Sequence, residues 1–310
     1  MTQPFRRLAV LGLGLLGGSV AIAARRRGVA IRVAGGARRA DVRALALARG
    51  AVDEAGDFEA AAMGADLVVL ATPVFAMPDV VRRIAPALAP GAIVTDVGSV
   101  KGELALVLPG LLPAGIVYVG SHPMAGGHRS GIEHAREDLF EGAACVVTEA
   151  PDAALRERVC GFWRALGARV VLRDAASHDA EVAWMSHLPH ALAFAYAGAL
   201  RSAPERAFEV AGPGFHDFTR IAHSEPELWA DILAANRKAL SAPLQLAGQI
   251  LAELGRAIES NDVEALERFL GAARVALSRG EVRGSDPTAH GDPNPRRPQR
   301  PGGARRTSRS

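Results

Sequence analysis

Cysteine, lysine and aromatic residues are scarce in this chain of 310 residues. Its two cysteines, Cys145 and Cys160, are too few to cross-link a secreted scaffold of this size, and no Cys/His cluster has the spacing of a zinc site. We therefore expect a reducing, cytoplasmic compartment and no metal. Only two of the 36 basic residues, Lys101 and Lys238, are lysines. Because arginine is so strongly favoured by composition, a single arginine is weak evidence for a binding site.

The chain also lacks a long uninterrupted hydrophobic run, and residues 1–280 carry little net charge. The apolar stretch 8–24 follows Arg6 and Arg7 as in a signal sequence, but four glycines at a turn-like spacing interrupt it. We therefore expect neither a signal nor a membrane partner. The formal charge is +3, yet residues 281–310 hold seven arginines and three acids, which leaves residues 1–280 at −1. A nearly neutral body argues against a nucleic-acid partner.

The first half of the chain alternates short apolar runs with helical patterns. Expected strands are 8–11, 31–34, 67–71, 93–96, 117–119, 145–148 and 170–172. Expected helices between them include 16–27, 41–49 and 78–88. This alternation predicts βαβ units around a parallel sheet, and so an α/β fold.

After residue 174 the strand patterns cease. The helices expected there are 177–201, 226–240, 242–260 and 263–277. Helix 242–260 carries apolar residues at helical spacing, so we expect it to be largely buried. Since about a hundred residues of helices form a thin core alone, we predict that they pack against a second subunit as a homodimer. Residues 280–310 lack apolar periodicity, and we predict a disordered basic tail there.

A glycine-rich turn follows the first strand and leads into the first helix. Gly12, Gly14 and Gly17 have the GxGxxG spacing, in which the first glycine permits the turn and the second lets the backbone approach a pyrophosphate. The third glycine allows the helix to pack closely on the strand. We predict a dinucleotide site, whose expected contacts also include Leu15, Thr72 and Pro73.

The end of the second strand bears on the choice of cofactor. An acid is expected there if the ribose 2′-hydroxyl of NAD is bound, but the chain has Arg38 and Arg39 instead, with no acid before Asp41. Arginine pairs with a 2′-phosphate, so NADP is the preferred cofactor and NAD is possible. The alternative is that both arginines lie on a solvated helix start.

Polar residues stand where a purely structural chain would not need them. Two segments, DVGSVK (96–101) and GSHPMAG (120–126), follow strands at the carboxyl edge of the expected sheet, where ligands of such sheets bind. Two more, SHLPH (186–190) and GFHDFTRIA (214–222), lie in the helical half.

Together these segments resemble the prephenate and arogenate dehydrogenases of tyrosine biosynthesis, a branch of aromatic amino acid biosynthesis. The resemblance extends to about residue 279. It implies a Rossmann-type nucleotide-binding domain (1–174) followed by an all-α dimerisation and substrate domain (175–279), with the active site between them. It also implies oxidative decarboxylation of a small cyclohexadienyl substrate with reduction of NAD(P)⁺.

The resemblance assigns roles to five residues. His122 is similar to the catalytic histidine that accepts a hydrogen bond from the substrate hydroxyl, and Ser99 to a serine that contacts this histidine and the substrate. Arg220 is similar to the arginine that grips a substrate carboxylate. His187 and Trp229 match positions at the substrate. A metal between His187 and the nearby His190 is not expected, because no third ligand has a suitable spacing.

Two alternatives share this layout. Imine reductases such as pyrroline-5-carboxylate reductase also join a Rossmann domain to a helical dimer domain. A nucleotide-sensing regulator could keep the glycine-rich turn but would not need His122 together with Arg220. Within the family, prephenate is the leading substrate and arogenate or dual cyclohexadienyl specificity the alternative, since His216 and the segment 127–129 depart from the usual motifs.

Overall fold

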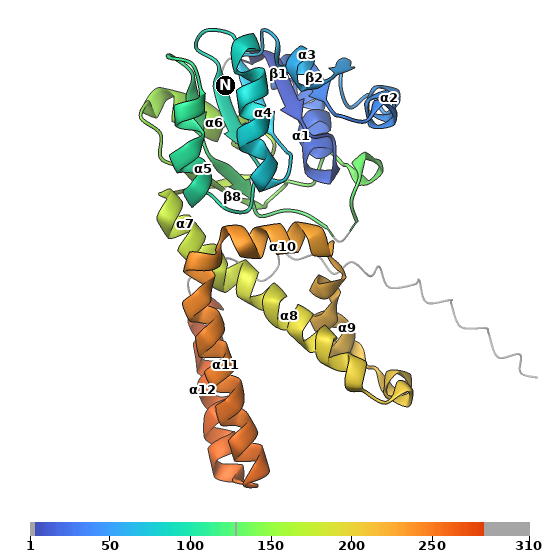
Figure 1. Cartoon of the computed structure of the whole chain (residues 1–310), viewed down its shortest axis with the longest axis vertical. Coiled ribbons are helices and arrows are strands. Elements are labelled where there is room, and N and C mark those ends of the chain that lie inside the picture. The colour runs from blue at the N-terminus through green and yellow to red at the C-terminus, as the bar shows by residue number, and fades with distance from the viewer. Residues whose placement is uncertain (1–3, 128, 282–310) are drawn as a thin grey trace, which may run out of the picture. The chain divides into compact units, whose positions relative to one another are not determined.

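The computed structural model describes residues 4–127 and 129–281. Six parallel strands form one sheet in the order β3-β2-β1-β4-β5-β6. Figure 1 shows β1 and β2 side by side in this sheet. The strands are β1 (Phe5–Leu11), β2 (Ala30–Gly36), β3 (Glu54–Gly56), β4 (Leu67–Leu70), β5 (Ile93–Asp96) and β6 (Val117–Val119). This order is that of the doubly wound dinucleotide-binding fold. The predicted α/β class and parallel sheet are therefore confirmed.

Helices connect the strands of this half of the chain, as the alternating pattern predicts. They are α1 (Leu15–Arg26), α2 (Ala40–Ala48), α3 (Phe58–Ala62), α4 (Met77–Ile84), α5 (Gly102–Val107) and α6 (Ala153–Ala165), with short turns η1 (Val74–Ala76), η2 (Ala85–Ala87), η3 (Pro109–Leu111) and η4 (Ile132–His134). Asp152 caps the N-terminus of α6, and its side chain accepts hydrogen bonds from the backbone N–H groups of Ala154 and Leu155. α1 ends before Gly28, which has a φ of +64°.

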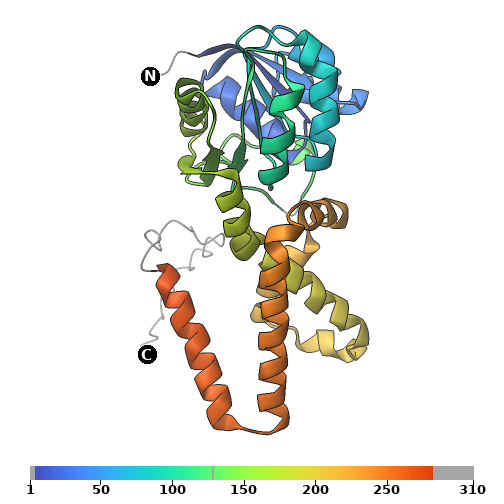
Figure 2. The ribbon, with the colours of Figure 1, turned by 60° about the vertical axis from the view of Figure 1, so that its left-hand side comes forward.

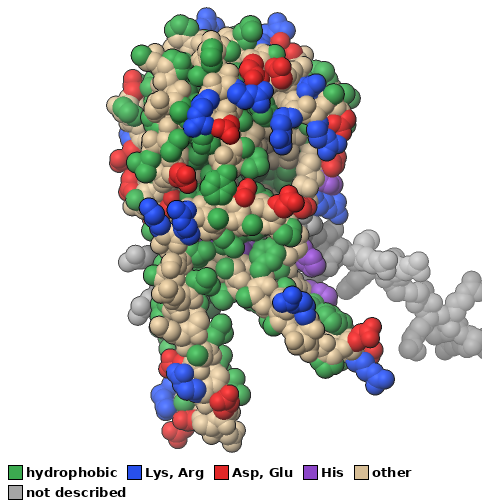
Figure 3. Space-filling view, in the orientation of Figure 1, with side chains coloured by type: hydrophobic (Ala, Val, Ile, Leu, Met, Phe, Trp, Pro, Cys, Tyr) green, Lys and Arg blue, Asp and Glu red, His purple; other side chains and the backbone are tan. Residues whose placement is uncertain are grey.

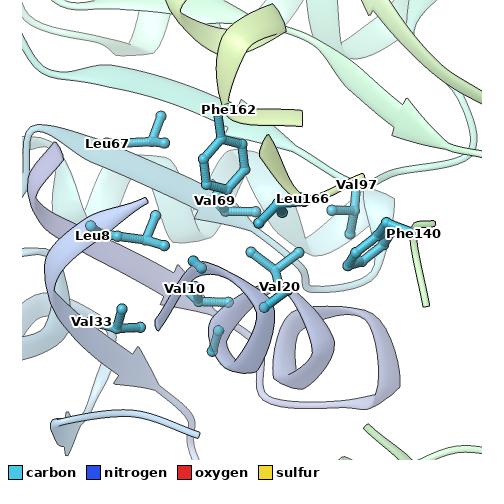
Figure 4. Packing of buried hydrophobic residues seen from close by; sticks show 14 of the residues in the cluster. Leu8, Val10, Val20, Val33, Leu67, Val69, Val97, Phe140, Phe162 and Leu166 are labelled. Carbon is cyan, nitrogen blue, oxygen red and sulfur yellow. The ribbon is translucent and has the colours of Figure 1, made fainter. Parts of the chain in front are cut away.

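Both faces of the sheet are buried. Along β1, Leu8 and Val10 pack in one hydrophobic cluster, while Ala9 and Leu11 belong to the cluster on the opposite face. Figure 4 shows the first cluster, in which Leu8 and Val10 lie among side chains from α1 and α6. Since successive side chains of a strand alternate between faces, a continuous apolar run is what such a sheet requires.

A second, smaller sheet contains β7 (Ser121–Pro123), β8 (Ala144–Thr148) and β9 (Arg169–Arg173). β7 pairs antiparallel with β8, and β8 pairs parallel with β9. Neither β7 nor β3 was expected from the sequence, because both are three residues long and lack an apolar run. The expected strands 145–148 and 170–172 exist but lie in this second sheet rather than the first.

Beyond β9 the described chain contains no strand, as expected. Its elements are α7 (Ala175–Val182), η5 (Ala183–His187), α8 (Leu188–Ala199), η6 (Leu200–Ser202), η7 (Glu205–Val210), α9 (Pro213–Thr219), η8 (Arg220–His223), α10 (Pro226–Ala235), α11 (Arg237–Glu259) and α12 (Val263–Glu281). The turn η5 is π-helical. It precedes Pro189, which has no N–H to continue an α-helical ladder.

Contacts within the chain divide it into two compact units after Gln249. The first unit contains all elements up to the first half of α11. The second contains the rest of α11 and α12, joined by a turn at Asn261, whose φ is +50° (Figure 2). The predicted domain boundary at residue 174 stays a prediction. Most of the predicted tail, residues 282–310, lies outside the described residues, and none of the described helices is long and apolar enough to cross a membrane.

Two expectations for the helical half are corrected. The break expected near residue 241 lies at Asn236, where α10 ends and α11 begins. Helix 242–260 was expected to be largely buried, yet Ile250, Leu251 and Ile258 are 41%, 57% and 60% exposed. Figure 3 shows further hydrophobic side chains on the surface of the helices that follow α7. The amphipathic pattern is present, but within this single chain little packs against it.

Candidate active site

The turn after β1 has the form of a dinucleotide cradle. Gly12 has a φ of +103°, and a Cβ there would lie 2.4 Å from the carbonyl oxygen of Ala71. A Cβ on Gly17 would lie 1.8 Å from the carbonyl oxygen of Gly12, whereas nothing lies within 4 Å of the Cβ position of Gly14. No side chain caps α1, and the buried hydroxyl of Thr72 has no hydrogen-bond partner among the described residues. These open polar groups fit a pyrophosphate at the helix N-terminus.

The remaining predicted cofactor residues surround this turn. Leu15 is the first residue of α1, and Pro73 follows β4 directly before η1. Arg38 and Arg39 are exposed in the turn between β2 and α2. Arg39 forms an ion pair with Asp41, which raises the pKa of Arg39 through a hydrogen bond and their opposite charges. The guanidinium of Arg39 is therefore already engaged by a carboxylate, while Arg38 lies beside it at the end of β2.

Asp96 organises the end of β5. Its Oδ1 accepts hydrogen bonds from the Tyr118 hydroxyl at 2.9 Å and from the backbone N–H of Ser121 at 3.0 Å. Its Oδ2 accepts one from the backbone N–H of Gly98 at 2.8 Å and pairs with the ammonium of Lys101. Burial, followed by the charge of Asp96, raises the pKa of Tyr118 well above its usual value, so the phenol stays a donor. This network ties the segment 97–101 to the start of β7.

His122 lies in the middle of β7 and is only 7% exposed. Its Nδ1 is 2.8 Å from Nε2 of His178 on α7. Burial is the main cause that holds the pKa of His122 well below 6.5, and electrostatic interactions with His178, Lys101 and His187 lower it further. An imidazole with so low a pKa is neutral at physiological pH and can accept a proton.

A carboxylate stands behind the two histidines. Oδ1 of Asp179 lies 2.8 Å from Nδ1 of His178 and accepts a hydrogen bond from the backbone N–H of Lys101, while Oδ2 accepts one from the backbone N–H of Gly102. Burial by itself would raise the pKa of Asp179, but these hydrogen bonds, the one from His178 first, hold it below its usual value. Asp179 is thus ionised and links α7 to the loop after β5.

A second group of rings surrounds Trp229 on α10. The ring of His190 stacks on Trp229 with centroids 3.6 Å apart, and the ring of His187 meets Trp229 edge-on at 6.1 Å. His187 is fully buried, and burial is the largest cause that lowers its pKa to about 4. Its Nδ1 lies 2.9 Å from the side-chain nitrogen of Asn236, and its Nε2 is buried without a hydrogen-bond partner in the part of the chain that the structure describes. A buried ring nitrogen without a partner is a candidate contact for a ligand.

Ser99 and Arg220 complete the predicted set. Ser99 is half-buried in the segment after β5, and no hydrogen bond among the described residues joins it to His122. Arg220 begins η8, is exposed, and has no ion pair with any described carboxylate. Its charge contributes to the lowered pKa of His190, after burial. The turn η8, which carries Arg220, packs against α8, which carries His190.

Comparisons with known proteins agree on one family. Residues 20–172 match the profile "Prephenate dehydrogenase, nucleotide-binding domain", and residues 174–272 match "Prephenate dehydrogenase, dimerization domain". The chain belongs to the prephenate dehydrogenase family. It is therefore an oxidoreductase that uses a pyridine nucleotide, and the imine reductase and regulator alternatives are removed. The Rossmann-type domain followed by a helical domain, implied by the resemblance, is confirmed.

Relatives in the family span most of this chain. The chain is 32% identical to the prephenate dehydrogenase of Lactococcus lactis, over 85% of this chain and 74% of that protein. It is 34% identical to the cyclohexadienyl dehydrogenase of Zymomonas mobilis, over 88% and 96%. The crystal structure of Aquifex aeolicus prephenate dehydrogenase, in complex with hydroxyphenyl propionate and NAD⁺, matches with a TM-score of 0.81 and 30% identity, over 91% and 100%.

Three residues of this site, His178, Asp179 and Asn236, were not predicted from the sequence. His178 and Asp179 precede the SHLPH segment by eight and seven positions, and Asn236 lies at the break between two helices. An adjacent histidine and aspartate in a helix is a weak signal, because helices commonly expose such pairs. No cluster of three or more potential metal ligands occurs among the residues that the structure describes.

Proposed function

We propose that this protein converts prephenate to 4-hydroxyphenylpyruvate and carbon dioxide, with NADP as the preferred hydride acceptor, in L-tyrosine biosynthesis. The observation that best supports the proposal is the environment of His122. Its imidazole is buried beside the nucleotide-binding sheet and close to His187, and its pKa is lowered. Arogenate or dual cyclohexadienyl specificity is the alternative, since arogenate differs from prephenate only by an amino group in place of the keto group.

The reaction needs a base that takes and returns one proton. His122 accepts the proton of the ring hydroxyl while a hydride leaves the ring carbon that bears this hydroxyl. A bound oxidised nicotinamide would accept that hydride. Loss of carbon dioxide from the ring then makes the ring aromatic and leaves a phenolate oxygen. His122 returns the proton to this oxygen, so the overall reaction releases no proton from the site.

Cationic and donor groups would hold the two carboxylates of prephenate. Arg220 offers a planar guanidinium that can form two parallel hydrogen bonds to one carboxylate. His187 offers a buried nitrogen to which no described residue is hydrogen-bonded, and Trp229 provides an apolar wall beside it. Ser99, at the end of β5, is proposed to contact the substrate from the side of the nucleotide.

The preference for NADP rests on the turn after β2. That turn carries Arg38 and Arg39 and has no acid before Asp41, and its exposed guanidinium groups could pair with a 2′-phosphate. Because Arg39 already pairs with Asp41, Arg38 is the residue we expect to matter more. Substitution Arg38→Ala should raise the KM for NADP about tenfold or more and change the KM for NAD little.

The exposed apolar side chains of the helical half support a homodimer. Hydrophobic residues of α8, α11 and α12 remain accessible in the single chain, among them Tyr196, Leu251 and Leu270 at 40%, 57% and 60%. We propose that a second copy covers them, as the description of the matched dimerisation domain suggests. Light scattering after size exclusion should give twice the chain mass, and a monomer would remove this part of the proposal.

A reducing, cytoplasmic compartment is part of the same proposal. Cys145 and Cys160 are both free and buried, which supports an enzyme that works without disulfides.

The decisive experiment measures initial rates with the purified protein. Prephenate and arogenate are each offered with NADP and with NAD, and formation of the reduced nicotinamide is followed by absorbance. We expect turnover with prephenate and a higher kcat/KM with NADP. Turnover with arogenate alone would show that the alternative, arogenate specificity, is correct. No turnover in any of the four combinations would refute the proposed function.

A further inference from the structure

A hydrogen-bonded chain of three side chains ends at His122. Nδ1 of His122 lies 2.8 Å from Nε2 of His178, and Nδ1 of His178 lies 2.8 Å from Oδ1 of Asp179. All three side chains are buried. His122 comes from β7, whereas His178 and Asp179 come from α7. The chain therefore connects the sheet that carries the proposed base to the first helix of the helical half.

The direction of each hydrogen bond follows from the charge of Asp179. An ionised carboxylate can only accept, so Nδ1 of His178 must carry a hydrogen and donate it. We take His178 to be neutral, in which case its other nitrogen, Nε2, is an acceptor. Nδ1 of His122 must therefore donate to it, which leaves Nε2 of His122 without a hydrogen. This is the protonation state that a base at Nε2 requires.

Asp179 also acts on the second histidine, through its backbone. The side-chain nitrogen of Asn236 lies 2.9 Å from the carbonyl oxygen of Asp179 and 2.9 Å from Nδ1 of His187. A carbonyl only accepts, so the amide of Asn236 must turn its NH₂ group to this side. That group can only donate, so Nδ1 of His187 is an acceptor and its hydrogen is on Nε2. Nε2 of His187 is buried and has no hydrogen-bond partner among the residues 4–127 and 129–281.

We propose that Asp179, acting through His178 and Asn236, fixes the two site histidines in opposite tautomers, so that His122 presents an acceptor nitrogen and His187 a donor nitrogen to the substrate. In terms of the proposed function, on which this part rests, Nε2 of His122 takes the hydroxyl proton and Nε2–H of His187 binds a substrate oxygen. His178, Asp179 and Asn236 are positioning residues, because they act through the two histidines.

The same chain stabilises His122 after it has accepted the proton. The imidazolium formed on His122 keeps its Nδ1–H directed at Nε2 of His178, and the negative charge of Asp179 stands at the far end. An aspartate that orients a catalytic histidine directly contributes about 10⁴-fold to kcat in serine proteases. Since a second ring separates Asp179 from His122, we expect a smaller contribution, about 10²-fold.

The first test observes the tautomers without turnover. Imidazole ¹⁵N chemical shifts and couplings are measured by NMR in the full-length protein at neutral pH, and the two histidines are assigned by the signals lost in His122→Asn and His187→Asn. We expect His122 to carry its hydrogen on Nδ1 and His187 on Nε2. A hydrogen on Nε2 of His122, or on Nδ1 of His187, overturns the proposal.

The second test separates positioning from packing. In His178→Phe the ring remains but cannot accept a hydrogen bond, whereas in His178→Gln an amide oxygen can accept from Nδ1 of His122. We expect His178→Phe to lower kcat about 10²-fold with a nearly unchanged KM. We expect His178→Gln to recover at least tenfold of this loss. Equal losses in both variants, or full activity in His178→Phe, would contradict the proposal.

A matched control lies on the same helix. Asp174→Asn changes an exposed carboxylate that caps α7, and asparagine caps equally well, so kcat should stay within about twofold. Failure of the proposed function and failure of the proposed tautomers can be told apart. If the wild-type protein oxidises neither prephenate nor arogenate, the proposed function is wrong, while the NMR result still decides the tautomers.

Discussion

The ammonium of Lys101 pairs with the carboxylate of Asp96, and neither side chain is exposed to solvent. The backbone N–H of the same lysine donates to Asp179, so Lys101 lies between the network that holds β7 and the chain that ends at His122. A buried pair of this kind is costly to break, because the remaining charge loses both its partner and its access to water.

Removal of this lysine should destabilise the fold. Lys101→Met leaves Asp96 buried with only neutral donors, and we expect a loss of about 3 kcal/mol in the free energy of unfolding, measured by urea denaturation at fixed protein concentration. The chain offers a matched control in its other lysine. Lys238 is exposed on α11, and Lys238→Met should change the stability by less than about 0.5 kcal/mol. Equal effects would contradict the account of Asp96.

The pH dependence of activity should report the low pKa of His122. Burial, then His178 from α7, Lys101 from the segment after β5 and His187 from η5, hold this pKa well below 6.5. A base works only when unprotonated, so kcat/KM should fall as the pH drops through this lowered pKa. We expect the acid limb of the profile to lie below pH 6.5. A midpoint at or above 6.5 would show that a different group is the base.

The folded state should also weaken in acid because of His187. Its pKa is about 4 when folded and 6.5 when unfolded, so between these values the unfolded chain binds more protons and stability falls as the pH falls. Full protonation of His187 should lower the free energy of unfolding by about 3 kcal/mol. Urea denaturation at pH values above and below this window should show that acid lowers the free energy of unfolding less in His187→Gln than in the wild type. Identical losses would be evidence that His187 is not buried in solution.

The substrate role of Arg220 can be tested by a substitution that keeps its charge. Lysine cannot form the two parallel hydrogen bonds of a guanidinium, so Arg220→Lys should lower kcat/KM for prephenate about 10- to 100-fold, mainly through KM. The KM for NADP should not change. Arg82→Lys, at an exposed position of α4, serves as the control and should leave both constants within about twofold.

Apolar periodicity predicted most of this fold, and its failures have physical causes. β1, β4 and β5 were predicted because strands buried on both faces read as continuous apolar runs. β7 was missed because Ser121, His122 and Pro123 carry no such run, and their strand geometry comes only from pairing with β8. The helix break at Asn236 was misplaced because the apolar pattern continues across it.

The family resemblance pointed to His122, His187 and Trp229, but not to the side chains that contact them. His122 and His178 are 56 positions apart, and Asn236 and His187 are 49 apart. The pattern of a single element does not indicate which polar groups of distant elements meet. Ser99 is the opposite case. The family motif suggested a contact with His122, but no such hydrogen bond occurs among the described residues.

The most direct test of the central claim is the activity of His122→Asn. Asparagine keeps a polar side chain in β7 but cannot accept a proton at neutral pH. We predict that kcat with prephenate falls by about 10²- to 10⁴-fold while the Kd for NADP stays within about twofold of the wild type. A variant that retains full kcat would show that the hydroxyl proton is taken elsewhere, and the account of this site would then be wrong.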